Sequence, residues 1–188
     1  MICMTSSPIA TMLRGVRPDV RRIIESTLVR IPAHLLEIAA AAGTRIVPLK
    51  PRQTYAQASP ALRRLGANVD AWPCPPAGLF VVEEATLYLR HTSPMTIAHE
   101  FFHALDAALG GGTYLSTTDP QIRAAFANAT RFVTPYAASA GDEYFAESAR
   151  AMTAINDDRS LWPTATPARL LACDPTMHAI IERIFNHA

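Results

Sequence analysis

The motif His-Glu-x-x-His constrains this chain more than any other feature of its sequence. It consists of His99, Glu100 and His103 and lies within an apolar segment, residues 96–106. Two histidines four residues apart lie on one face of a helix, one turn from each other. This spacing lets both imidazoles bind one Zn²⁺ ion, and it places the glutamate between them where it can act as a general base. The motif therefore predicts a zinc-dependent hydrolase.

The composition is that of a globular protein. The chain has 188 residues, of which 49% are hydrophobic and 18% charged, enough for one domain with a sizeable core. A net charge of +1 provides no overall field to attract nucleic acid. No apolar run reaches the roughly 18–20 residues that span a bilayer, and residues 1–20 lack the features of a secretory signal. We expect no nucleic-acid partner, no membrane span, and a cytoplasmic protein or one exported by a non-classical or dedicated route.

The cysteines indicate no metal site of their own. Cys3, Cys74 and Cys173 are odd in number and form no Cys-x-x-Cys pair. This pattern predicts neither a disulfide framework nor a cysteine zinc site, and it leaves open whether two of them pair.

Hydrophobic periodicity predicts an α+β fold, with a small sheet ahead of the metal-binding helix and a mostly helical C-terminal half. We expect a leader and helix in residues 1–27 and a single catalytic domain in residues 28–188. The expected elements are helices in 19–42 broken near Pro32, a strand at 44–49, a proline-rich loop at 50–77 with a short helix at 61–65, paired strands at 79–82 and 86–90, and helices at 94–109, 120–129, 142–156 and 176–186.

A second acidic pair at helical spacing, Glu143 and Glu147, follows the motif. A catalytic zinc commonly takes three protein ligands and a water molecule, so the two histidines need a third partner. One carboxylate of the pair can complete the site while the other orients a ligand histidine. The alternative is a solvated acidic stripe. We expect Glu143, the upstream member, to be the third ligand and Glu147 to orient a histidine.

Asp106 lies three residues after His103 on the same helical face. It could accept a hydrogen bond from a ligand histidine, or it could cap a neighbouring helix, and the sequence favours neither. The remaining histidines have no metal-binding spacing relative to the motif and are not expected to be ligands: His34, His91, His178 and His187.

The residues 97–106, Tyr136 and 142–147 together resemble the catalytic domain of anthrax lethal factor and are similar to the Pro-Pro endopeptidases. The resemblance covers roughly residues 28–156. It implies a zincin-like fold of the gluzincin type, with the first glutamate of the second motif, Glu143, as the third zinc ligand. It also implies that Tyr136, seven residues before Glu143, points at the substrate carbonyl; a plain loop aromatic is the alternative.

Two residues depart from the family pattern. Phe102 stands where glycine is often found before the second histidine, and Tyr144 stands where phenylalanine is usual. Neither is a predicted ligand. Phe102 is expected either to narrow the site or to change the packing of the helix.

The predicted function is therefore a zinc-dependent endopeptidase, of the kind used as a bacterial effector or toxin. A peptide substrate would bind in extended form along an edge strand, either 79–82 or 86–90. The alternatives are an intracellular regulatory metal-binding protein and a zinc amide hydrolase with a non-peptide substrate. Glu100 argues against a purely structural zinc site, because such a site needs no general base.

Overall fold

The computed structural model describes residues 7–13, 15–160 and 162–187. Its first half mixes helices with a small sheet. The elements in chain order are α1 (Pro8–Met12), α2 (Pro18–Leu28), α3 (Ala33–Ala41), β1 (Arg45–Pro48), α4 (Tyr55–Ala58), α5 (Pro60–Leu65), the 3₁₀ helix η1 (Val69–Ala71), β2 (Gly78–Val81), the 3₁₀ helix η2 (Val82–Glu84) and β3 (Thr86–Leu89).

The second half is helical. It begins with α6 (Pro94–Leu109) and continues with α7 (Leu115–Thr118), α8 (Pro120–Asn128), the 3₁₀ helix η3 (Tyr136–Ala138), α9 (Gly141–Thr153), α10 (Pro167–Cys173) and α11 (Pro175–His187). The α+β arrangement is confirmed. Helices α1, α4, α7 and α10 were not predicted from the sequence, because each is short and lacks clear periodicity, and α1 lies in the segment that was expected to be a leader.

The sheet has the order β1-β3-β2. β2 pairs antiparallel with β3, as the predicted strand pair requires, and β1 pairs with β3 in parallel. Because side chains alternate between the faces of a strand, Leu87 and Leu89 enter the main core while Tyr88 faces the opposite side. Because β3 pairs with β1 on one side and with β2 on the other, it is the central strand. The interpretation of 86–90 as an edge strand for substrate was wrong, and the alternative, 79–82, corresponds to β2, which lies at an edge.

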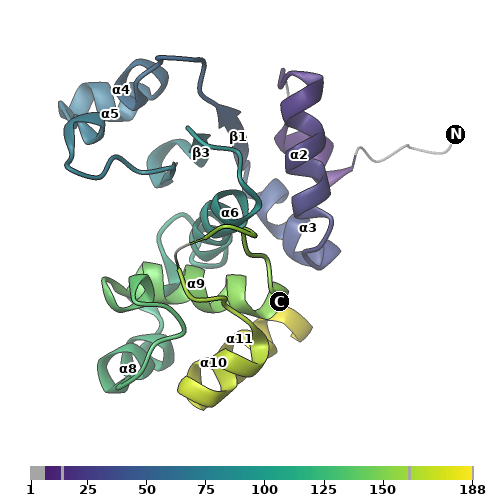
Figure 1. Cartoon of the computed structure of the whole chain (residues 1–188), viewed down its shortest axis with the longest axis vertical. Coiled ribbons are helices and arrows are strands. Elements are labelled where there is room, and N and C mark those ends of the chain that lie inside the picture. Colours follow the sequence, from purple (N-terminus) through teal and green to yellow (C-terminus); the bar gives the residue numbers. More distant parts are fainter. Residues whose placement is uncertain (1–6, 14, 161, 188) are drawn as a thin grey trace, which may run out of the picture.

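Helix α6 lies in the middle of the molecule, with the sheet and α4 and α5 to one side and α8 to α11 to the other (Figure 1). It begins where the sequence predicts, since Ser93 Oγ accepts a hydrogen bond from Thr96 N at 3.2 Å and Pro94 occupies the first turn. It ends at Gly110, and both Gly111 and Gly112 have positive φ angles, which glycine adopts at little cost. Every residue from Thr96 to Ala107 is buried.

One main apolar core surrounds α6. It includes residues from elements far apart in sequence, among them Leu28 of α2, Leu35 of α3, Phe145 of α9 and Ile181 of α11. Met12 and Leu13, in the expected leader, are also buried in this core. None of the helices in the described residues is long and apolar enough to cross a membrane. Cys74 and Cys173 are free thiols, and Cys3 lies outside the described residues.

Candidate metal and catalytic site

The two motif histidines project from α6 toward the same point. Their Nε2 atoms are 3.1 Å apart. Both side chains are buried, with residue exposures of 8% for His99 and 5% for His103. The i, i+4 spacing on a regular helix is sufficient to bring them together, as the sequence predicts.

Helix α9 packs on α6 and brings Glu143 to the histidines. Its Oε2 lies 3.0 Å from Nε2 of His99 and 3.2 Å from Nε2 of His103. The three ligand atoms all lie within 4.8 Å of one another, so these residues could hold a metal ion. Two imidazole nitrogens and one carboxylate oxygen match the donors that zinc takes in catalytic sites, which leave a further position open.

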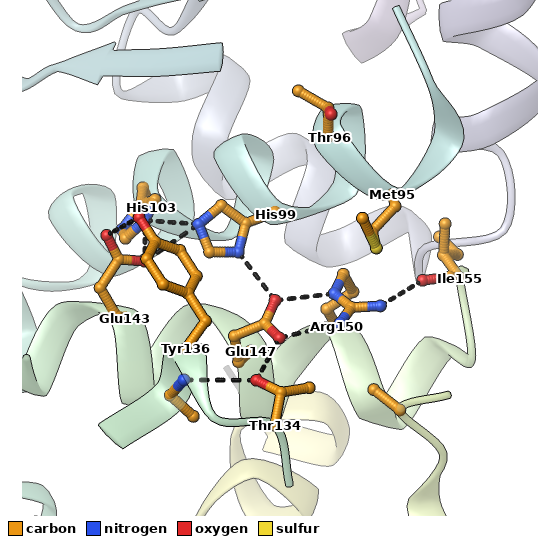
Figure 2. A network of polar contacts seen from close by, with 12 residues as sticks. Met95, Thr96, His99, His103, Thr134, Tyr136, Glu143, Glu147, Arg150 and Ile155 are labelled. Carbon is orange, nitrogen blue, oxygen red and sulfur yellow. Dashed lines mark hydrogen bonds and ion pairs between the residues drawn. The ribbon is translucent and has the colours of Figure 1, made fainter. Parts of the chain in front are cut away.

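Glu147 lies one turn after Glu143 and faces the other nitrogen of His99. Nδ1 of His99 lies 2.9 Å from Oε1 of Glu147, so an Nδ1–H can donate to this carboxylate while Nε2 faces Glu143 and His103 (Figure 2). Orientation of a ligand histidine through its second nitrogen is common at metal sites. The structure therefore brings Glu147 against His99, and its role in orienting a zinc ligand stays a prediction.

Glu147 is itself held from two sides. Arg150, which is 1% exposed, donates from Nε to Oε1 at 2.9 Å and from an η nitrogen to Oε2 at 2.8 Å. Thr134 donates its hydroxyl to Oε2 at 2.6 Å. Sequence reasoning missed both residues. The i, i+3 spacing of Glu147 and Arg150 could have indicated the ion pair, but nothing in the sequence pointed to Thr134.

The carboxylates give the site a strong preference for positive charge. Burial would by itself lower the pKa of His99, but hydrogen bonds to Glu143 and Glu147 raise it to about 10. Burial opposes ionisation of Glu143 and Glu147 as well, yet the histidines hold the pKa of Glu143 well below its usual range, and His99 and Arg150 do the same for Glu147. A proton on His99 or a metal cation meets this requirement.

Glu100 is buried on the same helix and lines the cavity beside His99. Burial, and to a smaller extent the charge of Glu143, raise its pKa, while His99, His103 and the backbone N–H of Phe80 in β2 oppose this rise. The carboxylate therefore lies between the edge strand and the ligand cluster.

Tyr136 lies in η3, and its hydroxyl donates to Oε1 of Glu143 at 2.8 Å. Its ring centroid is 5.4 Å from that of His99. Burial of the hydroxyl, together with the charge of Glu143, raises the pKa of Tyr136 far above its usual value, so the phenol remains a hydrogen-bond donor.

Asp106 takes the second of the two roles that the sequence left open. Its Oδ1 accepts the backbone N–H of Ser116 at 2.8 Å and its Oδ2 accepts the hydroxyl of Ser116 at 2.5 Å. These bonds hold the first turn of α7. Within the described residues, Nδ1 of His103 has no hydrogen-bond partner, so the other role, a bond from this histidine to Asp106, is not seen. The cluster includes none of His34, His91, His178 and His187.

A cavity of about 300 Å³ lies beside the cluster and is lined by one of its three members, His99. Its other lining residues are the segment Pro75–Gly78, the polar residues Glu100, Glu147 and Arg150, and Met95, Thr96, Tyr136 and Trp162. Trp162 is 46% exposed, and its ring centroid lies 6.0 Å from that of Tyr136. No pattern in the sequence linked Trp162 or Met95 to the site.

The two departures from the family pattern lie away from the ligands. Phe102 is fully buried and its ring centroid lies 6.0 Å from that of Phe185 in α11, so it changes helix packing rather than narrowing the site. Tyr144 donates a short hydrogen bond to Asp174. Asp174 also accepts the N–H of Met177 at 2.9 Å in the first turn of α11. The extra hydroxyl of Tyr144 thus connects α9 to α11.

No protein-family model and no curated protein sequence matches the chain. Among solved structures, the chain is similar to a Pro-Pro endopeptidase from Paenibacillus alvei, with a TM-score of 0.66 and 19% sequence identity over 95% of this chain and 100% of that one. The likeness to anthrax lethal factor and the gluzincin assignment stay predictions. The comparison shows that this chain has the same overall fold as that Pro-Pro endopeptidase.

Proposed function

We propose that the chain is a zinc-dependent endopeptidase with Glu100 as general base and a zincin-like fold. The observation that carries the proposal is the convergence of Nε2 of His99, Nε2 of His103 and Oε2 of Glu143 within 4.8 Å, beside the buried Glu100 in an open cavity. A structural zinc site usually has four protein ligands and needs no such carboxylate. The shared fold with an endopeptidase supports a peptide substrate.

His99, His103 and Glu143 would hold the zinc ion, which would supply a Lewis acid able to polarise the scissile carbonyl and acidify water. Glu100 takes the proton from the attacking water and delivers it to the leaving amine. Its burial raises its pKa and so makes it a better proton acceptor than an exposed glutamate. Tyr136 donates its hydroxyl hydrogen to the carbonyl oxygen as negative charge develops there.

The remaining polar residues orient these groups. Glu147 keeps Nε2 of His99 free for the metal by accepting the hydrogen of Nδ1. Arg150 and Thr134 in turn hold Glu147 in one position. This arrangement removes rotational freedom from His99 before any substrate binds.

The free edge of β2 provides a path for an extended peptide. In the part of the chain that the structure describes, β2 pairs only with β3, and its first residue, Gly78, lines the cavity. In an antiparallel pair, alternate residues direct their N–H and C=O groups away from the partner strand. Ala77 O accepts from Arg90 N at 2.9 Å, so the peptide groups of Gly78 point to the free edge. A peptide can therefore add to β2 as a further strand.

The test is metal analysis combined with the substitution Glu100→Gln. We expect about one zinc per chain in both proteins. The wild type should cleave members of a synthetic peptide panel that includes Pro-Pro bonds, and the variant should lose a factor on the order of 10²–10⁴ in kcat. Glu37→Gln, at an exposed position of α3, is the matched control and should retain full activity.

Two results would overturn the proposal. A wild-type protein that binds no zinc would remove its basis, and a fully active Glu100→Gln variant would remove the general base. A protein that binds zinc and hydrolyses only small non-peptide amides would favour the alternative amide hydrolase. The role as an effector or toxin stays a prediction from the family resemblance.

A further inference from the structure

The proline-rich segment 50–77 folds against the sheet as a small unit. Its residues Tyr55 and Val69 form a second apolar cluster with Tyr88 of β3, on the sheet face opposite α6. Glu84 strengthens the attachment by accepting hydrogen bonds from Ser59 Oγ at 3.0 Å and from Ala61 N at 2.6 Å. The segment is therefore packed and hydrogen-bonded, although its sequence predicts mainly loop.

The end of this segment forms one wall of the cavity beside His99 and Glu100. The wall consists of Pro75, Pro76, Ala77 and Gly78. Proline has no backbone N–H, so the first two wall residues can be held by hydrogen bonds only through their carbonyl oxygens. The hydroxyl of Tyr55 donates to the carbonyl of Pro76 at 2.9 Å.

Tyr55 is in turn fixed by its surroundings. Its side chain is fully buried, and the guanidinium carbon of Arg90 lies 4.7 Å from the centre of its ring. Asp70 accepts the backbone N–H of Tyr55 at 2.9 Å and forms an ion pair with Arg90. Burial raises the pKa of Tyr55 to about 12, so its hydroxyl remains a donor at neutral pH.

We propose that Tyr55 is a positioning residue for substrate binding, because its hydroxyl holds the Pro76 carbonyl and thereby fixes the cavity wall that a bound peptide contacts. The proposal rests on the proposed peptidase function and adds to it a residue outside the cavity lining. It assigns to segment 50–77 the role of supporting the substrate-facing wall.

The test is Tyr55→Phe, which keeps the ring, its packing and the contact of the ring with Arg90, and removes the hydroxyl. We expect KM to rise about two- to tenfold, the factor that the loss of one hydrogen bond gives. The kcat and the zinc content should remain those of the wild type. Tyr88→Phe is the matched control: Tyr88 lies in the same cluster, but its hydroxyl donates to Glu84 at 2.6 Å and does not contact the wall. It should leave KM unchanged.

Hydrogen–deuterium exchange of the zinc-loaded proteins gives a readout independent of activity. The amides of residues 74–80 should exchange faster in Tyr55→Phe than in the wild type and in Tyr88→Phe, while those of α6 remain unchanged. Unchanged exchange together with unchanged KM would overturn the proposal, and so would an equal rise of KM in both variants. If the wild type cleaves no peptide, the proposed function fails, and faster exchange at the wall would still support the anchoring role of the Tyr55 hydroxyl.

Discussion

A Cβ atom added to Gly78 would lie 2.5 Å from Cγ of Glu100 and 3.0 Å from its carboxyl carbon. Real Cβ contacts of this length essentially do not occur, so any side chain at this position must displace Glu100 or the edge strand. The absence of a side chain on Gly78 therefore allows the predicted general base to lie directly against β2.

We expect Gly78→Ala to lower kcat by a factor on the order of 100. The added methyl group displaces the carboxylate of Glu100 from its catalytic position, while the ligand residues stay in place. Steady-state kinetics and zinc analysis measure the two effects separately. Gly141→Ala is a suitable control, since a Cβ there would meet its nearest neighbour, Ser116 O, at an ordinary 3.9 Å. Equal activity of both variants would contradict the prediction.

Glu147→Gln should weaken zinc binding about 10- to 100-fold without abolishing it. The amide preserves the size of the side chain but replaces an ionised acceptor that His99, Thr134 and Arg150 all contact. Competition with a fluorescent chelator measures the zinc affinity. An affinity equal to that of the wild type would show that His99 keeps its orientation without the carboxylate.

Tyr144→Phe should lower the free energy of unfolding by roughly 1–3 kcal/mol, the cost of leaving a buried polar partner unsatisfied. Its hydroxyl donates to Asp174, which is 7% exposed. Urea denaturation of the metal-free protein measures the change. Zinc affinity and kcat should not change, because the Tyr144 hydroxyl, the only group removed, bonds to Asp174 and not to a predicted ligand. A loss of zinc binding would instead imply that α9 shifts as a whole.

The dependence of stability on pH should carry a contribution from Asp106. Burial raises the pKa of this carboxyl from 3.8 to about 6, in spite of its two hydrogen bonds from Ser116. The folded state therefore binds the proton more tightly than the unfolded state. The stabilising contribution of Asp106 to the free energy of unfolding is therefore largest below pH 3.8, and it decreases as the pH rises through 6.

The substitution Asp106→Asn isolates this contribution, because the amide does not titrate. We expect the stability of the variant relative to the wild type to increase between pH 4 and pH 6 and to level off above that range. Urea denaturation at several pH values measures the difference. A difference that is constant with pH would show that Asp106 has the same pKa in both states.

The sequence predicted the elements with strong periodicity and missed those held by tertiary contacts. The helix at 94–109 has an N-cap serine, a proline in its first turn and glycines after its end, and the structure shows it with the same bounds. Helix α7 has no side-chain N-cap of its own, and Asp106 satisfies its first turn from a helix earlier in the chain. Local sequence cannot reveal such a partner.

The residues of the candidate site likewise fall into those that local sequence predicts and those that only tertiary packing brings in. The pairing of His99 and His103 follows from the sequence alone, because residues four apart on a helix share a face whatever surrounds them. Only the tertiary structure brings Glu143 beside them, since it is 40 residues after His103 and reaches it through the packing of α9 on α6. The tertiary structure also decides that Asp106 bonds to Ser116 and that Pro75–Gly78 form a wall of the cavity. They depend on how side chains from distant segments fill space together, which local periodicity does not encode.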